Sequence, residues 1–387
     1  MMRVVHFIAG VDASHGGPAI ALAGLVPAQV RAGLDVDVVA WARAGADPKL
    51  IAAMQRAGAT VNVVTYRDQR RWQRLASPQR LREAVDDAVA RADVCHIHGL
   101  WEPIQHIAAR CALQRSVPYL LRPCGLLGPW PMRHHRWRKR FYYAWRMRRH
   151  IERAAALHYA TAVERDTARL VPQGIPAIVE PHGVDEAAFA QRPGAVERQS
   201  NGRQVLFLGR LHPMKGLDLL IPAFAAATPA DAHLCIAGPD REGYAPALQR
   251  LARSHGVERR VRFAGMVEGA EKFALLAAAD VLALPSRYEN FGLVVIEALA
   301  AGTPAVISDQ VATWRDLVPA GVAAAVPLRC KPLAKRLSCW LNAPEHLQRL
   351  GERARCYARK HHNQDVIAQR WCAHYDRIVR GPRRAMA

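Results

Sequence analysis

Strand-like apolar runs alternate with helix patterns along almost the whole chain. The runs are short, rich in Val, Ile and Leu, and bounded by turn residues: 4–8, 36–40, 60–64, 94–98, 119–122, 157–160 and 177–181, then 204–209, 233–237, 261–264, 281–284 and 305–308. Because parallel strands need a crossover helix, this alternation predicts an α/β protein with parallel sheets. The polar run 191–203 between the two series indicates a linker.

The length of 387 residues and the apolar content of 51% are enough for two cores. We expect an N-terminal domain over 1–185 and a C-terminal domain over 186–362, with a helix at about 363–380 that packs back on the first. No run resembles a signal peptide or a transmembrane helix, and the eight cysteines form no CxxC pair. These features are typical of a cytoplasmic protein with reduced thiols.

Two carboxylates stand eight residues apart across a predicted loop-to-helix junction. Glu289 follows a strand that stops at Pro285, and Glu297 lies two turns into the next helix. The helix start is expected to leave the N–H groups of 291–293 unpaired, which favours an anion site beside Glu289. Glu297 is surrounded by apolar residues, so its charge needs a dedicated partner.

The spacing of Glu289 and Glu297 resembles the Glu-x7-Glu motif of the family 4 retaining glycosyltransferases, also called glycosyl transferases group 1. The segments 209–218, 237–240 and 263–266 follow the family's order and approximate spacing. The resemblance is to members that build bacterial polysaccharide and lipopolysaccharide. It implies the GT-B fold, with two Rossmann-like domains whose parallel sheets face a central cleft. It also implies that Glu289 and the following residues Asn290, Phe291, Gly292 and Leu293 contact the donor sugar and diphosphate, and that Glu297 holds the nucleotide ribose.

Two cations flank the loop that follows the first strand of the second series. Arg210 comes after that strand and Lys215 precedes a helix, so both are expected at the carboxyl end of a parallel sheet. By resemblance they are the diphosphate contacts of a nucleotide-sugar, and Gly16 and Gly17 would bring backbone N–H groups to the same diphosphate. The sequence has no Walker motif and no GxGxxG after a strand, so nucleoside triphosphates and dinucleotides are not indicated.

His98 ends an apolar strand, and the resemblance places it at the family's active-site histidine, near the donor's hydroxymethyl group and the acceptor. A core histidine is the alternative. His96 shares a strand face with His98, but the sequence shows no third ligand at metal spacing.

The net charge of +21 indicates anionic partners. It is concentrated in 133–150, where Trp137, Phe141 and Trp145 recur every four residues among arginines. One helix with this pattern would suit an anionic membrane surface. Alternatively, the aromatic stripe belongs to the core and the arginines to a solvated face. No recognition module accompanies the charge, which disfavours nucleic acid.

The resemblance implies transfer of a hexose, with retention, from a nucleoside-diphosphate sugar to a hydroxyl of a glycan or lipid-linked glycan in cell-surface polysaccharide assembly. No metal and no cofactor is expected, and the protein would be cytoplasmic or peripheral on the membrane's inner face. A metal-dependent Asp-x-Asp transferase is the first alternative, but Asp35 and Asp37 open a strand rather than close one. A non-catalytic basic anion-binding protein is the second, although it would not need Glu289, Glu297, Arg210 and Lys215 together.

Overall fold

The computed structural model describes residues 1–11, 17–43, 46–66, 79–133, 136–190 and 202–381. Its contacts divide the chain into two compact units, which we call unit 1 (1–183 and 364–387) and unit 2 (184–363). The first boundary lies two residues before the expected one at 185. The predicted linker 191–203 falls outside the described residues, apart from its last two. No described helix is long and apolar enough to cross a membrane.

Unit 1 is built on a seven-stranded parallel sheet in the order β3-β2-β1-β4-β5-β6-β7. Its strands are β1 (Arg3–Ile8), β2 (Asp35–Arg43), β3 (Thr60–Tyr66), β4 (Val94–His98), β5 (Tyr119–Arg122), β6 (Ala156–Tyr159) and β7 (Ala177–Val179). Its helices are α1 (Gly17–Arg31), α2 (Pro48–Arg56), α3 (Gln79–Ala90), α4 (Pro103–Gln114), α5 (Pro129–Arg133), α6 (Arg136–Tyr142), α7 (Arg148–Arg153), α8 (Ala162–Thr167) and α17 (Gln364–Arg380), with a π-helical turn at Tyr143–Met147.

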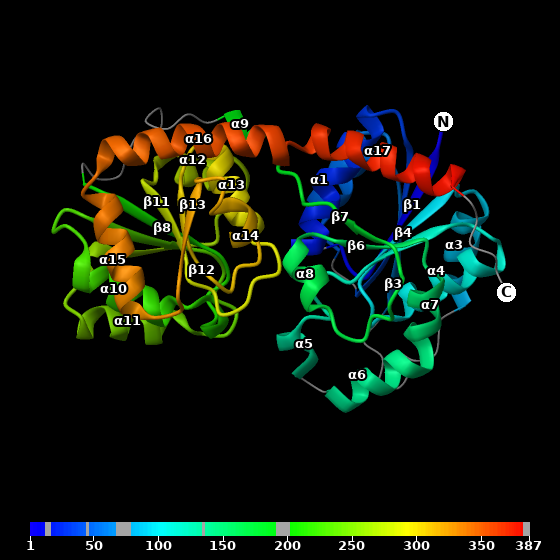
Figure 1. Cartoon of the computed structure of the whole chain (residues 1–387), viewed down its shortest axis with the longest axis horizontal. Helices are drawn as coiled ribbons and strands as arrows, with labels where there is room; N and C mark the ends of the chain where they lie inside the picture. Colours follow the sequence, from blue (N-terminus) through cyan, green and yellow to red (C-terminus); the bar gives the residue numbers. More distant parts are fainter. Residues whose placement is uncertain (12–16, 44–45, 67–78, 134–135, 191–201, 382–387) are drawn as a thin grey trace. The chain divides into compact units, whose positions relative to one another are not determined.

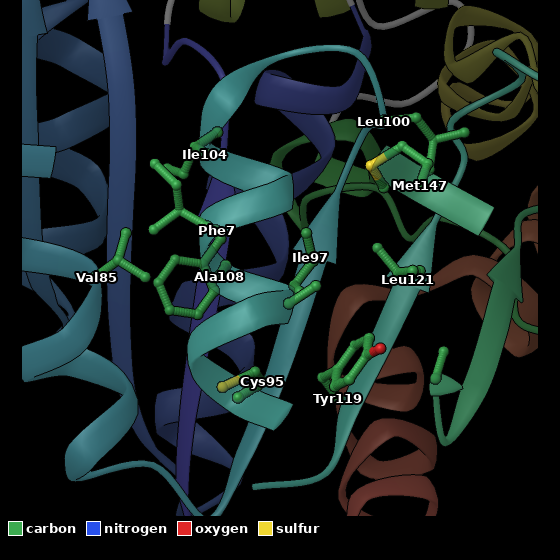
Figure 2. Packing of buried hydrophobic residues seen from close by; sticks show 14 of the residues in the cluster. Phe7, Val85, Cys95, Ile97, Leu100, Ile104, Ala108, Tyr119, Leu121 and Met147 are labelled. Carbon is green, nitrogen blue, oxygen red and sulfur yellow. The ribbon is translucent and has the colours of Figure 1, made fainter. Parts of the chain in front are cut away.

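Helices cover both faces of this sheet, so both faces are buried. Figure 2 shows Phe7, Cys95 and Ile97 packing with Val85 of α3 and Ala108 of α4. The opposite face carries the alternate strand residues and is covered by α1, α2 and α17. Helices α1 and α17 lie side by side (Figure 1), although more than 300 residues separate them in the sequence.

Unit 2 is built on a six-stranded parallel sheet in the order β10-β9-β8-β11-β12-β13. Its strands are β8 (Gln204–Leu208), β9 (His233–Ala237), β10 (Val261–Gly265), β11 (Val281–Leu284), β12 (Ala305–Ser308) and β13 (Ala323–Val326). Its helices are α9 (Ala187–Ala190), α10 (Leu217–Ala227), α11 (Ala245–Ser254), α12 (Gly269–Ala278), α13 (Leu293–Ala301), α14 (Trp314–Leu317), α15 (Cys330–Leu341) and α16 (Pro344–His362), with 3-10 turns at Pro213–Lys215 and Glu258–Arg260.

The predicted α/β class with parallel sheets is confirmed. Strand β13 was not predicted, because its Ala-Ala-Ala-Val sequence lacks the β-branched and aromatic residues that indicate a strand. It forms at the sheet edge by pairing with β12.

Both sheets reverse their strand order at one place, between β1 and β4 in unit 1 and between β8 and β11 in unit 2. The crossover connections leave these neighbouring strands toward opposite faces, which opens a crevice at their carboxyl ends. Ligands of open α/β sheets bind there, so these two places are where functional residues are expected.

The last helix of unit 1 supplies a large part of its core through Trp371, which is 1% exposed and stacks on Tyr375 at 5.2 Å. Trp371→Ala should lower the free energy of unfolding by about 3–5 kcal/mol through the cavity it leaves. Urea denaturation followed by circular dichroism measures the change. Asp376→Ala on the same helix removes only an exposed pair with Arg380 and should stay within about 0.5 kcal/mol. Equal effects of the two substitutions would contradict this packing role.

Candidate active site

Two loops meet at the switch point of unit 2, one after β8 (209–216) and one after β11 (285–292). Gly216 has a φ of 72°, and a Cβ there would lie 2.0 Å from the Pro285 carbonyl oxygen. Only glycine allows the two loops to approach so closely. Gly216 also ends the 3-10 turn and begins α10, as the Lys215-Gly216 pair predicted.

Arg287 fastens the second loop to the first. Its backbone N–H donates to the Met214 carbonyl at 2.7 Å, and its guanidinium donates to both carboxylate oxygens of Asp218 at 2.8 and 2.6 Å. Such a bidentate pair holds planar groups in one orientation. The two loops therefore form one fixed platform.

Lys215 and Glu289, one from each loop, form an ion pair through Nζ and Oε2. Their side chains are 19% and 21% exposed, so the pair can be reached from solvent. Arg210 is exposed and makes no hydrogen bond or ion pair with any described residue. Among the described residues, the platform thus presents the Lys215–Glu289 ion pair and the unpaired cation Arg210, beside the Arg287–Asp218 pair that fastens its loops.

Helix α13 begins at Leu293, with Gly292 as its left-handed N-cap (φ 77°). Of the residues 291–293 predicted to supply unpaired N–H groups, Phe291 precedes the helix, Gly292 is its N-cap and Leu293 is its first residue. The N–H of Val295 already bonds the Gly292 carbonyl at 2.8 Å. The first free helical donors are those of Leu293 and Val294, because a helix leaves its first N–H groups without carbonyl partners. Asn290, half-buried, lies in the turn before them.

Glu297 is 8% exposed, and Lys272 of α12 supplies the partner that its burial requires, with Nζ donating to Oε1 at 2.8 Å. Lys272 was not predicted as this partner, because it stands 25 positions before Glu297 and meets it only through the packing of α12 on α13. One signal was available: Lys272 is the only cation in α12, whose other residues are apolar or glycine except for Glu271.

A cavity of about 400 Å³ lies at the switch point of unit 1. The ends of β1 and β4 line it with Gly10 and His98, and Trp41, Tyr66 and Trp101 add aromatic walls. Gly17 is the exposed first residue of α1, whereas Gly16 lies outside the described residues.

His98 belongs to a row of histidines on the sheet face under α1 and α17. The row consists of His6 on β1, His96 and His98 on β4 and His158 on β6, none more than 2% exposed. His6 is a third histidine beside His96 and His98, and its distance from them in the sequence is why no third ligand at metal spacing was evident there. Strand pairing places His6 opposite His96, and the nearest ring nitrogens of His6, His96 and His98 lie within 4.8 Å of one another. The register of β1 on β4 cannot be read from the sequence.

These three rings are arranged for hydrogen bonding rather than for holding one metal ion. His96 and His98 stack at 4.4 Å with 22° between their planes, so their in-plane lone pairs do not converge on one point. Tetrahedral coordination needs converging lone pairs. His6 Nδ1 instead lies 3.0 Å from His98 Nε2, at hydrogen-bond distance.

Asp35 and Asp37 lie at the amino end of β2, opposite the edge where ligands bind. Asp35 pairs with Arg3, and Asp37 is 6% exposed with Arg91 at 3.9 Å. Both carboxylates therefore have structural partners in unit 1.

From residue 136 onward the cationic segment lies in one unbroken helical run, made of α6, the π-helical turn and α7. Trp137, Phe141 and Trp145 are 70%, 69% and 61% exposed, so they are not part of the core. Tyr143 and Met147 point inward instead. Figure 1 shows α6 at the margin of unit 1.

Two family models match the chain. The model described as "Glycosyl transferase 4-like domain" matches residues 16–178, and that described as "Glycosyl transferases group 1" matches residues 191–356. The chain belongs to the group 1 glycosyltransferases. The platform of Lys215, Glu289 and Glu297 lies within the second match, and the histidine row, except for His6, within the first.

A phosphatidyl-myo-inositol mannosyltransferase of Mycobacterium leprae is 36% identical over 165 residues, which cover 40% of this chain and 43% of that protein. The match thus spans less than half of this relative. Among solved structures, Anabaena HepE in complex with UDP and glucose has a TM-score of 0.77 at 19% identity, over 97% of this chain and 100% of HepE. WaaG, a glycosyltransferase involved in lipopolysaccharide biosynthesis, has a TM-score of 0.68 at 18% identity, over 98% and 100%. These likenesses show that this group 1 member has the GT-B fold.

Burial lowers the pKa of every histidine in the row of this glycosyltransferase-family chain. The pKa of His6 falls to about 4, and those of His96, His98 and His158 lie well below the usual value. Neighbouring Arg122 lowers all four further by repulsion. The folded rings are therefore neutral at pH 7.

Acid should destabilise unit 1 through these rings. The unfolded chain takes up protons near pH 6.5, whereas folded His6 does so only near pH 4, so the stability is complete above pH 6.5 and is lost as the pH falls toward 4. Each ring can contribute up to about 1.4 kcal/mol per pH unit. Urea denaturation at pH 7.5, 6.0 and 5.0 should show this slope. His6→Gln should reduce it and His255→Gln, on the surface of unit 2, should not; a flat profile would contradict the pKa shifts.

Proposed function

We propose that the protein is a retaining glycosyltransferase that moves a hexose from a nucleoside-diphosphate sugar to a hydroxyl of a glycan or lipid-linked glycan in cell-surface polysaccharide assembly. The observation that carries the proposal is the platform of unit 2. It gathers Arg210, Lys215, Glu289 and the start of α13 at the carboxyl edge of a parallel sheet. A diphosphate attached to a sugar needs this combination of cations, N–H donors and hydroxyl acceptors.

The diphosphate would lie against Arg210, Lys215 and the N–H groups of Leu293 and Val294. Arg210 has no described partner to give up, so its charge is fully available. Lys215 is held in place by Glu289 before any ligand arrives, which reduces the ordering cost of binding. Glu289 would then accept hydrogen bonds from the hydroxyls of the donor hexose.

Glu297 would hold the ribose. Lys272 contacts Oε1 of its carboxylate, so Oε2 can accept from a ribose hydroxyl while the charge stays compensated. The fixed Lys272 contact also orients the carboxylate, because a buried ion pair resists rotation.

Departure of the nucleoside diphosphate is the difficult step of the proposed reaction, because negative charge builds on the leaving phosphate. Arg210, Lys215 and the positive end of the α13 dipole would stabilise that charge from fixed positions. HepE was solved with UDP and glucose, and the M. leprae relative is called a mannosyltransferase; both names support a nucleotide and a hexose as ligand chemistry.

We propose that the acceptor uses the unit 1 cavity beside His98. Trp41, Tyr66 and Trp101 give it apolar walls that can stack on sugar rings, and Glu102 and Gln105 add polar groups. His98 is placed there as the catalytic histidine, together with Glu289, Arg210 and Lys215 in unit 2.

Removing one charged side chain of the proposed donor site should weaken donor binding without unfolding the protein. Arg210→Ala, Lys215→Ala and Glu297→Ala should each cost about 1.5–3 kcal/mol, the value of a charged hydrogen bond, or roughly tenfold or more in dissociation constant. The ligand is the nucleoside-diphosphate hexose that gives the largest thermal shift in a screen of UDP, GDP and ADP sugars, and calorimetry measures its affinity.

Arg259→Ala is the matched control for Arg210→Ala. Arg259 is also exposed but lies before β10, at the amino edge of the same sheet. It should leave the affinity unchanged. Folded Arg210 and Lys215 variants with wild-type affinity would rule out the assigned platform, and binding without any transfer would favour the anion-binding alternative.

Transfer should continue when a chelator is present, because side chains and a helix end meet the charge of the leaving group. Product formation with and without excess EDTA should differ by less than twofold. This is smaller than the roughly tenfold effect expected when a cation such as Arg210 is removed. Loss of transfer on chelation, with recovery on adding Mn²⁺ or Mg²⁺, would instead favour the metal-dependent alternative.

We further propose that the cationic segment 133–150 docks on an anionic membrane. This segment carries eight Lys and Arg residues and no carboxylate. Its exposed rings match the membrane interface: Arg136 stacks on Trp137 at 4.9 Å and Arg146 on Trp145 at 4.5 Å. Because the rings lie between arginines, apolar surface and positive charge would enter the membrane to the same depth. Aromatic rings and cations both favour the headgroup layer.

Replacing Arg136, Arg140 and Arg149 by Glu should abolish cosedimentation with anionic vesicles, since each arginine contributes about 1 kcal/mol near such a surface. The wild type should bind vesicles with phosphatidylglycerol, not neutral ones, and should be released by salt. The matched control changes Lys331, Lys335 and Arg336, exposed on α15, to Glu and should bind normally. Equal binding to neutral and anionic vesicles, or no binding to either, would contradict the docking proposal and leave the donor platform unaffected.

A further inference from the structure

The histidine row of unit 1 is part of a longer chain of buried polar side chains. Gln29 of α1 and Tyr375 of α17 join it from the covering helices, and both are completely buried. The chain ends at the Arg122 guanidinium on one side and at the Glu180 backbone carbonyl on the other. These two ends decide where every proton in the chain resides.

At one end, the Glu180 carbonyl can only accept, so His158 carries its proton on Nε2, which lies 2.9 Å away. His158 Nδ1 must then accept from His96 Nε2–H at 3.1 Å. His96 Nδ1 is left as an acceptor and receives the Tyr375 hydroxyl proton at 2.8 Å.

At the other end, Arg122 can only donate, so His98 Nδ1, 3.5 Å from Arg122 Nη1, is an acceptor. His98 therefore carries its proton on Nε2 and donates it to His6 Nδ1 at 3.0 Å. His6 Nε2–H donates to Gln29 Oε1 at 2.9 Å, and Gln29 Nε2–H donates to the Tyr375 oxygen at 3.2 Å.

The two branches meet at Tyr375, which accepts from Gln29 and donates to His96. The opposite direction would require the Gln29 amide to be reversed. Two donors, Arg122 Nη1–H and His98 Nδ1–H, would then face each other at one end. Two acceptors, His158 Nε2 and the Glu180 carbonyl, would face each other at the other end. Only the first direction of donation gives every donor an acceptor at both ends of the chain. It requires each ring to be neutral and to carry one proton.

We propose that Tyr375 is a positioning residue for His98: through Gln29 and His6 it holds the His98 imidazole in the form protonated on Nε2, with Nδ1 as its only lone pair. The role of His98 in transfer rests on the proposed function, whereas its protonated nitrogen does not. In this form His98 cannot donate a ring proton to a ligand in the adjoining cavity, because Nε2–H is committed to His6. Its Nδ1 accepts from Arg122 Nη1 at 3.5 Å.

Tyr375→Phe in the full-length protein tests the proposal, because the ring still fills its place while the hydroxyl is lost. Gln29 then no longer has to donate to Tyr375 and can reverse its amide, so that only the 3.5 Å contact with Arg122 still opposes reversal of the branch through His6 to His98. Nitrogen NMR of ¹⁵N-histidine-labelled protein distinguishes protonated from unprotonated ring nitrogens. The wild type should show His98 protonated on Nε2 alone between pH 6 and 8, and Tyr375→Phe should show both forms of His98. Transfer should fall several-fold in kcat with little change in KM for the donor.

Asp365→Asn is the matched control, because the Arg31–Asp365 pair joins the same two helices at 2.6 Å but is exposed and lies outside the chain. It should leave the His98 signals and kcat unchanged. Gln29→Met is a second variant in case Tyr375→Phe does not fold, and it should release His98 in the same way.

Wild-type His98 protonated on Nδ1, or His98 signals unaffected by both variants, would overturn the proposal. So would a metal ion bound in equal amount to the purified protein and lost in His6→Gln, since the metal would replace the shared protons. A changed His98 with an unchanged kcat would also overturn the positioning role. If no nucleoside-diphosphate sugar supports transfer, the proposed function fails, while the NMR result still decides the state of His98.

Discussion

The parallel order of each sheet, with one reversal point, is the constraint on which the candidate site depends. It brings the ends of β8 and β11 side by side although more than 70 residues separate them, and the loops that follow inherit that proximity. The close approach then requires glycine at 216, and the Arg287–Asp218 pair fixes it. Lys215 and Glu289 meet only because these loops are fastened to each other. Strand order thus brings the two loops together, and the side chains on them then supply the charges of the platform.

The sheet of unit 1 buries polar side chains on the face under α1 and α17. Four imidazoles, an amide and a phenol lie where an α/β sheet normally buries aliphatic side chains, and each would cost about 1–3 kcal/mol without a partner. Their hydrogen bonds offset that cost only when Gln29 of α1 and Tyr375 of α17 face the histidines. The row therefore also fixes the rotation of these two helices about their axes. An apolar face of the same volume would be at least as stable but would tolerate slippage of α17. Specific docking of α1 and α17 is what the polar row adds.

Local sequence patterns predicted what depends on neighbouring residues. The spacing of Glu289 and Glu297, with seven residues between them, and the glycine after Lys215 are local signals. The strands were found from runs of Val, Ile and Leu. Contacts across the fold were not predictable: Lys272 beside Glu297 and His6 beside His98 depend on helix packing and strand register. Strand β13 escaped because alanines carry no strand preference. The exposure of Trp137, Phe141 and Trp145 could not be read from their spacing, since a buried stripe has the same period.

The division of unit 1 between the two ends of the chain has a consequence for synthesis on the ribosome. Residues 184–363 form unit 2 without interruption, whereas unit 1 is complete only after α17 has emerged. At about 5–20 residues per second, translation of the intervening segment takes roughly 10–35 s. During that time Trp371 and Tyr375 are missing and one face of the first sheet, with its histidines, lacks its cover. The second unit can therefore finish folding before the first, and a nascent chain arrested before residue 364 would expose an incomplete sheet that chaperones can recognise.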